Sequence, residues 1–259
     1  PAQMRGGRVK ELVVKYARIA DEYVGRDEAQ FIRPSATAQH DLFAYLAECG
    51  RANVTELNKD FSAAALRNLV ARGIVVLEEE ETLRTPYSGL EGENIKEVTL
   101  TPAQSTVVAK INHDKKGVYL LHGVTGSGKT EVYMRAISDV LKSGKTAIML
   151  VPEISLTPQV LRSFRARFGD EVALLHSGLS VGERFDEWRR LIGSRAKVAV
   201  GARSAVFAPL KNVGLIIIDE EHDSSYVSES NPRSVTHEVA AFRAKYNDCP
   251  LVLGSATPS

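Results

Sequence analysis

The segment from residue 123 to residue 130 restricts the folds open to this chain more than any other feature. It reads GVTGSGKT, and it stands between an apolar run, residues 118–121, and a segment with apolar residues at helical spacing. That stripe consists of Val132, Tyr133, Ala136, Ile137, Val140 and Leu141. A glycine-rich turn that connects a buried strand to an amphipathic helix is typical of parallel α/β sheets, so we predict such a sheet here.

Five more apolar runs follow the turn and alternate with helical segments. They are residues 146–151, 172–175, 197–200, 215–218 and 251–253. This alternation predicts a parallel sheet with helices on both faces. We assign residues 99–259 to this larger α/β domain.

The glycine-rich segment also matches the pattern GxxxxGK[ST] of phosphate-binding loops. Glycines let successive backbone N–H groups wrap a phosphate, and the N-terminus of the next helix adds a positive dipole. We predict that Lys129 reaches the β and γ phosphates of ATP and that Thr130 ligates Mg²⁺. The other nucleotide contacts are expected from Gly123, Thr125, Gly126, Ser127 and Gly128. The alternative, an incidental lysine after a turn, is disfavoured by the flanking strand and helix.

Two carboxylates, Asp219 and Glu220, follow the aliphatic run 215–218. Ligands of open α/β sheets bind at the carboxyl ends of the strands. We therefore predict that Asp219 holds Mg²⁺ and that Glu220 orients or deprotonates the attacking water, with Lys129 as the third catalytic residue. Two acids after a strand can also begin a solvated loop, but the phosphate-binding loop makes that the minor alternative.

Residues 37–86 have a different pattern, three short helices followed by two strands. The helices are predicted at residues 38–50, 54–61 and 62–71, and the strands at 74–77 and 83–86 with a turn at 78–82. This order is typical of a small winged-helix domain. We interpret residues 1–36 as a linker or the end of a missing N-terminal domain, which only a family resemblance can identify as a DNA-binding domain, and the polar residues 87–98 as a second linker.

Charge leaves two roles open for this small domain. Residues 36–98 carry six basic and eleven acidic side chains, a net charge of −5, although the whole chain has a formal charge of +1. The run Glu78 to Glu81 would repel phosphate, so contact with DNA and service as a packing or interaction module remain alternatives.

Cysteine content and hydropathy indicate the cellular compartment in which the protein works. Cys49 and Cys249 lie far apart without a CxxC spacing, so the sequence predicts neither a disulfide framework nor a zinc site. No apolar run approaches the roughly 20 residues that span a bilayer. We expect a cytoplasmic protein without a membrane partner.

Several motifs together resemble a known family. Residues 219–222, DEEH, resemble the DExH box of superfamily 2 helicases, and LTPAQ (100–104), PEISLTPQ (152–159) and GSATP (254–258) are similar to other landmarks of that group in the same order. The resemblance implies a RecA-like first helicase lobe in which Gln104 reads adenine. It also implies DNA contacts from Pro152 and Thr157. The residues that would link nucleotide state to DNA are His222, Ser255 and Thr257.

Longer strings are similar to the PriA family of replication-restart helicases. They are GVTGSGKTEVY (123–133), LVPEISLTPQ (150–159), LHSGLS (175–180), GARSAVFAP (201–209) and DEEHDSSY (219–226). The resemblance implies an ATP-hydrolysing 3′ to 5′ DNA helicase of replication restart and primosome assembly. Arg203 and Ser204 are further DNA-contact candidates, and a surface ion pair is the alternative role for Arg203.

The family also implies parts and partners beyond these residues. Its members carry a second lobe and a zinc-binding region, so we expect this chain to be a fragment that binds nucleotide and DNA but hydrolyses ATP feebly, and we expect zinc only in the full-length protein. The expected partners are forked and single-stranded DNA, other primosome proteins and single-strand-binding protein. One departure is that residues 227–235 contain no aromatic residue for base stacking. The alternatives are a non-catalytic winged-helix scaffold with a structural nucleotide, or another superfamily 2 translocase.

Overall fold

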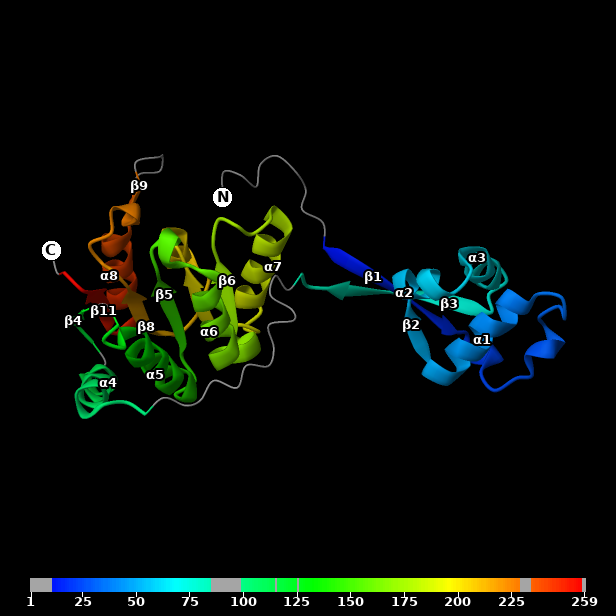
Figure 1. Ribbon diagram of the computed structural model, residues 1–259, viewed down its shortest axis with the longest axis horizontal. Coiled ribbons are helices and arrows are strands. Elements are labelled where there is room, and N and C mark those ends of the chain that lie inside the picture. Colours follow the sequence, from blue (N-terminus) through cyan, green and yellow to red (C-terminus); the bar gives the residue numbers. More distant parts are fainter. Residues whose placement is uncertain (1–10, 85–98, 115, 125, 229–233, 258–259) are drawn as a thin grey trace. The chain divides into compact units, whose positions relative to one another are not determined.

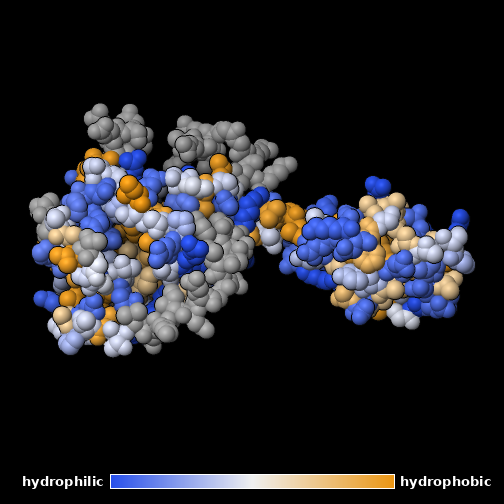
Figure 2. All heavy atoms as spheres, viewed as in Figure 1, coloured by the Kyte–Doolittle hydropathy of each residue, from blue (hydrophilic) through white to orange (hydrophobic). Residues whose placement is uncertain are grey.

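The computed structural model describes residues 11–84, 99–114, 116–124, 126–228 and 234–257 (Figure 1). They form two compact units, one within residues 10–84 and a larger one that contains residues 99–257. Apolar side chains gather in separate cores in the two units. On the face shown in Figure 2, hydrophilic residues cover most of each unit, and apolar residues appear between them in small groups.

The larger unit is built on a six-stranded parallel sheet with the strand order β4-β11-β8-β5-β7-β6. Its strands are β4 (Val118–His122), β5 (Thr146–Leu150), β6 (Val172–Leu175), β7 (Val198–Gly201), β8 (Val213–Ile218) and β11 (Leu251–Ser255). All six runs predicted as strands are confirmed, each to within two residues at either end. Strands buried on both faces read as continuous apolar runs, which is why the sequence pattern identified most of them. In β4, at one edge of the sheet, Val118 and Leu120 are exposed.

Helices cover both faces of this sheet (Figure 1). One face packs against α4 (Pro102–Asp114), α5 (Lys129–Lys142) and α6 (Pro158–Phe168), and the other against α7 (Val181–Ile192) and α8 (Thr236–Asn247). Side chains of β8 alternate between the two cores, since Ile217 lies with α5 and Ile218 with α8. The predicted α/β fold with a RecA-like lobe is therefore confirmed.

Short elements complete the larger unit. The 3₁₀ helices are η4 (Glu153–Ser155), η5 (Gly169–Glu171), η6 (Arg203–Phe207) and η7 (Ser224–Tyr226). Strands β9 (Val227–Ser228) and β10 (Ser234–Val235) pair antiparallel with each other. Among the described residues, no helix has both the length and the apolar composition needed to cross a membrane.

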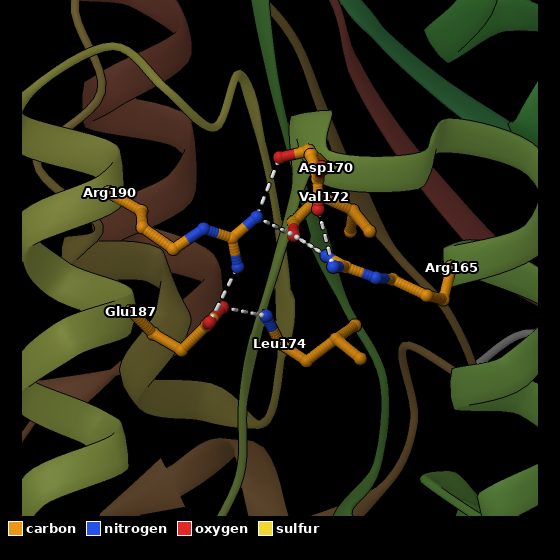
Figure 3. Close-up of polar contacts among 6 residues, drawn as sticks. All are labelled: Arg165, Asp170, Val172, Leu174, Glu187 and Arg190. Atoms are coloured by element: carbon orange, nitrogen blue, oxygen red, sulfur yellow. Dashed lines mark hydrogen bonds and ion pairs between the residues drawn. The ribbon is translucent and has the colours of Figure 1, made fainter. Parts of the chain in front are cut away.

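Polar side chains bond to the outer edge of the sheet at β6 (Figure 3). The Glu187 carboxylate accepts the N–H of Leu174 at 2.9 Å and a guanidinium hydrogen of Arg190 at 2.6 Å. Arg190 also donates to the carbonyl oxygens of Asp170 (2.6 Å) and Val172 (3.2 Å). Glu187 and Arg190 are buried, at 1% and 6% exposure. Their side chains therefore bond the backbone groups of the edge strand that would otherwise bond to water or to another strand.

The small unit is a three-stranded antiparallel sheet with the order β2-β1-β3, packed against three helices. The strands are β1 (Leu12–Ile19), β2 (Arg51–Asn53) and β3 (Val75–Thr82). The helices are α1 (Thr37–Cys49), α2 (Val54–Asp60) and α3 (Ala63–Ala71), preceded by the 3₁₀ helices η2 (Asp21–Tyr23) and η3 (Glu28–Gln30). The three helices lie where the sequence predicted them.

Two predictions for this unit were wrong. Residues 12–19, which we interpreted as part of a linker or of the end of a missing domain, form the central strand β1 and pair with β3 over eight residues. The predicted hairpin turn at 78–82 is also absent, because these residues continue β3, and Leu83 and Arg84 lie outside any strand. The unit thus begins well ahead of residue 37, and its sheet is completed from the N-terminal side rather than by a hairpin. The second linker, residues 87–98, lies outside the described residues.

Ion pairs across the sheet explain why an acidic run can be a strand. Glu79 pairs with Lys15 of β1 at 2.9 Å, directly opposite in the register. Glu78 pairs with Arg18 on a diagonal, since the residue opposite Arg18 in the register is Val76. Arg51 of β2 reaches across β1 to pair with Glu80. Glutamate is disfavoured in strands, but opposite charges on neighbouring strands stabilise the pairing.

Candidate nucleotide-binding site

The three predicted motifs lie at the carboxyl ends of three neighbouring strands. The glycine-rich loop follows β4, the GSATP segment includes the end of β11, and the DEEH segment follows β8. Backbone hydrogen bonds join them: the N–H of Gly123 donates to Ser255 O at 3.1 Å, and the N–H of Glu221 donates to Gly254 O at 2.9 Å. The sheet topology thus brings residues from distant parts of the chain to one edge.

The loop adopts a conformation that requires glycine. Gly126 and Gly128 have φ values of 80° and 82°, in the left-handed region that other residues rarely adopt. A Cβ atom at Gly128 would also lie 2.6 Å from Nε2 of Gln104. Gly128 precedes α5, so the N-terminus of a 14-residue helix opens onto the loop, as anion binding requires. Thr125 lies outside the described residues.

Lys129, the first residue of α5, is held inside the site. Its ammonium donates to the carbonyl oxygen of Gly123 at 2.6 Å and lies 3.6 Å from Oε1 of Glu220. The side chain is only 9% exposed. The Lys129 ammonium thus lies between the glycine-rich loop and the acidic segment. A bound phosphate would compete with Gly123 and Glu220 for this ammonium.

Asp219 is fixed by two buried tyrosines. The hydroxyl of Tyr133 donates to Oδ1 of Asp219 at 2.9 Å, and the hydroxyl of Tyr226 donates to the Asp219 carbonyl oxygen at 2.7 Å. Burial raises the pKa of the Asp219 carboxyl, although the Tyr133 hydrogen bond acts in the opposite direction. Glu220, next in the chain, has a φ of 45°. Residues other than glycine rarely adopt this conformation, and those that do are frequently found at functional sites.

Neither tyrosine was predicted as a site residue. Tyr133 was assigned only to the apolar stripe of α5. A buried tyrosine needs a partner for its hydroxyl, and that requirement was the signal available in the sequence.

The donor set suits Mg²⁺ bound together with a nucleotide. Magnesium is usually held by one or two carboxylates, with phosphates and water as its remaining ligands. Asp219 and Thr130 could supply such ligands, and Thr130 is exposed in the first turn of α5. Within the described ranges, no group of three or more His, Cys, Asp or Glu residues could hold a metal ion by itself. The residues therefore fit a metal shared with phosphate better than an all-protein metal site.

Gln104 contacts the loop directly. Its side-chain N–H donates to Ser127 O at 3.0 Å, and its side-chain oxygen accepts the N–H of Thr101 at 2.9 Å. The residue predicted to read adenine thus braces the phosphate-binding loop in this structure. An adenine that bonded to the carboxamide would have to replace these contacts.

Comparison with known proteins identifies the family. The sequence profile of DEAD/DEAH box helicases matches residues 101–259, more than half of the chain. This chain belongs to the DEAD/DEAH box helicase family. The nucleotide-site candidates that the structure describes, from Gln104 to Glu220, all lie within the matched region.

Within the family the chain is similar to replication restart proteins named PriA. It is 50% identical over 204 residues to replication restart protein PriA of Bacillus subtilis, covering 77% of this chain and 25% of that protein. It is 46% identical over 202 residues to PriA of Synechocystis, covering 76% and 24%. A solved structure of RecG bound to a three-way DNA junction has a TM-score of 0.46 and 28% identity, covering 62% of this chain and 21% of that one. The chain spans about a quarter of the length of the curated relatives it matches.

In this PriA-like helicase domain, the three coupling candidates form one connected group. Nδ1 of His222 lies 3.0 Å from Oγ of Ser255, which also accepts the N–H of Thr257 at 3.2 Å. His222 further approaches Oε2 of Glu220 at 3.9 Å. The acidic segment of the helicase domain is thus linked to the GSATP segment through side chains as well as through backbone.

The four DNA-contact candidates lie after two adjacent strands. Pro152 and Thr157 follow β5, and Arg203 and Ser204 follow β7. Thr157 caps α6, where its hydroxyl accepts the N–H of Val160 at 3.4 Å. Arg203 donates to the carbonyl oxygens of Ser225 (3.4 Å) and Val227 (3.1 Å), so its observed partners are backbone carbonyls and not the carboxylate of the alternative role, a surface ion pair.

Proposed function

We propose that this chain is the nucleotide-binding lobe of an ATP-dependent DNA helicase that moves 3′ to 5′ and acts in replication restart. The observation that carries the proposal is the meeting of Lys129, Asp219 and Glu220 at the carboxyl edge of the sheet. Lys129 lies 3.6 Å from Glu220, and Tyr133 of the same helix bonds to Asp219. A cation, a metal-ligating carboxylate and a candidate base next to a helix N-terminus are the components that ATP hydrolysis needs.

Each residue has a role in this proposal. Lys129 and the backbone of residues 123–128 bind the β and γ phosphates. Asp219 and Thr130 hold Mg²⁺, which neutralises charge on the phosphates when it is bound. Glu220 orients the attacking water and accepts its proton.

The DNA track is proposed along the ends of β5 and β7. The relatives named as replication restart proteins support a role in replication restart. Family resemblance suggests forked and single-stranded DNA, primosome proteins and single-strand-binding protein as partners. Arg203 would act by holding the chain at Ser225 and Val227 in place as well as by contacting phosphate. Binding should depend strongly on salt and little on sequence, since phosphate contacts dominate.

The test combines ATP turnover with DNA binding. Phosphate release would be measured with excess chain over radiolabelled ATP, with and without a forked oligonucleotide, and fluorescence anisotropy would follow DNA binding as salt increases. We expect ATP hydrolysis above the uncatalysed rate and affinity for DNA that falls with salt. Nucleotide binding without any hydrolysis would favour the structural-nucleotide scaffold instead. DNA binding that is insensitive to salt would reject the proposed track.

A further inference from the structure

Tyr133 is the point at which three segments of the site meet. It lies one helical turn after Thr130 on α5 and is 1% exposed. Its hydroxyl donates to Oδ1 of Asp219 at 2.9 Å, which joins residues 86 positions apart in sequence. Helix α5 and the acidic segment after β8 are therefore connected by a side-chain hydrogen bond as well as through the sheet.

Gly254 provides the space for this hydroxyl. A Cβ atom at Gly254 would lie 1.7 Å from the Tyr133 hydroxyl oxygen and 3.0 Å from Oδ1 of Asp219. No side chain at position 254 is compatible with the observed position of Tyr133. The Tyr133 hydroxyl therefore lies directly against the backbone of the GSATP segment at Gly254. The carbonyl oxygen of Gly254 also accepts the N–H of Glu221.

The hydrogen bond constrains one oxygen of the carboxylate. A phenol donates a single hydrogen, and here Oδ1 of Asp219 receives it in a buried setting where an unpaired hydroxyl would be costly. The second carboxylate oxygen is not used by Tyr133. Tyr226 bonds to the Asp219 carbonyl and not to its carboxylate, so the two tyrosines hold different parts of the same residue.

We propose that Tyr133 is a positioning residue, which orients the Asp219 carboxylate so that its second oxygen is available to Mg²⁺ or to a water on the metal. The inference rests on the proposed function, because it assumes that Mg²⁺ binds with nucleotide at Asp219. Partners that orient a metal ligand typically change metal affinity by about 10- to 100-fold when they are removed. Tyr133 would therefore set the Mg²⁺ requirement of nucleotide binding without touching the nucleotide.

Tyr133→Phe tests the inference because it removes only the hydroxyl. Fluorescent ADP would be titrated into the 259-residue chain, first with EDTA and then at increasing Mg²⁺. We expect affinity in EDTA within about twofold of the wild type, and a rise of about tenfold in the Mg²⁺ concentration that gives half of the metal-dependent tightening. A purely structural role would change both measurements together.

Two further variants make the result decisive. Tyr226→Phe removes a hydroxyl of similar burial that bonds to the Asp219 carbonyl, and we expect its Mg²⁺ requirement to stay near the wild-type value. Gly254→Ala should displace the Tyr133 hydroxyl and raise the Mg²⁺ requirement as Tyr133→Phe does. It serves as the second test if the tyrosine variant does not fold.

The inference is overturned if Tyr133→Phe keeps the wild-type Mg²⁺ requirement, or if Tyr226→Phe shifts it equally. Failure of the proposed function would look different. In that case the wild-type chain itself would show no Mg²⁺-dependent binding of ADP.

Discussion

The carboxylate of Glu187 accepts the backbone N–H of Leu174 at the free edge of the parallel sheet, at a distance of 2.9 Å. The same carboxylate pairs with Arg190, which reaches the carbonyl oxygen of Val172 two residues earlier. Burial raises the pKa of the Glu187 carboxyl, and the neighbouring Arg190 guanidinium opposes that shift. One ion pair on α7 thus supplies both a hydrogen-bond donor and an acceptor to the backbone of the edge strand β6.

Glu187→Gln should destabilise the larger unit. The amide cannot accept from both Leu174 and Arg190, and removal of one partner from a buried pair leaves an uncompensated charge, at a cost of about 3 kcal/mol. Urea unfolding followed by circular dichroism would measure the loss. The control is Glu171→Gln, which breaks the ion pair with Lys197. Both side chains of that pair are 44% exposed, so the substitution should cost less than about 1 kcal/mol. Equal losses would show that the edge contacts contribute no special stability.

Lys129→Ala should weaken ADP binding by at least about tenfold, because it removes a charge-assisted contact to phosphate at a site that is only 9% exposed. Isothermal titration calorimetry in Mg²⁺ measures this change. Lys142→Ala is the matched control, since Lys142 ends the same helix with a side chain that is 73% exposed. Unchanged affinity in Lys129→Ala would remove the loop from the phosphate site.

Glu220→Gln should keep ATP binding within about twofold and reduce hydrolysis by roughly 10² or more, since the amide preserves shape but cannot accept a proton. Single-turnover phosphate release with excess protein has the sensitivity that a slow reaction needs. The carbonyl oxygen of Glu220 accepts the N–H of Asp223 at 2.9 Å, a backbone contact that does not depend on the side chain, so the substitution should not disturb the fold. Full hydrolysis in this variant would exclude Glu220 as the base.

His40 should titrate at a pH above its ordinary value. Its Nδ1 lies 2.9 Å from Oε1 of Glu28, and this hydrogen bond raises the pKa of His40 above 6.5. The pair stabilises the small unit fully below that ordinary pKa, and the stabilisation is lost as pH rises through the raised one. An NMR titration checks the pKa, and Glu28→Gln should return it toward 6.5. An unchanged pKa in that variant would contradict the pairing.

The parallel sheet could be predicted because each of its strands carries enough apolar residues to be recognised alone. The strands β1 and β3 could not be assigned in this way. Leu12–Ile19 alternates only partly, and both of its partner strands come later in the chain. The acidic residues of Val75–Thr82 favour a turn until the basic residues opposite them are known.

The residues of the candidate site also differ in whether a sequence pattern could identify them. Lys129, Asp219 and Glu220 follow from spacing, because a loop and two acids after apolar runs have recognisable patterns. The contact of Tyr133 with Asp219 and that of Gln104 with Ser127 have no such pattern, since they depend on how helices pack over the sheet. Only the need of a buried hydroxyl for a partner suggests the first of them.

The paired charges of β3 bear on how the small unit meets other molecules. Lys15, Arg18 and Arg51 each lie against one glutamate of the run, so these charges act at a distance as dipoles, and a dipole's field falls off faster than that of a single charge. Mobile ions screen what remains beyond a Debye length of about 8 Å at physiological salt. A phosphate chain passing this sheet would therefore meet less repulsion from Glu78, Glu79 and Glu80 than three unpaired carboxylates would exert.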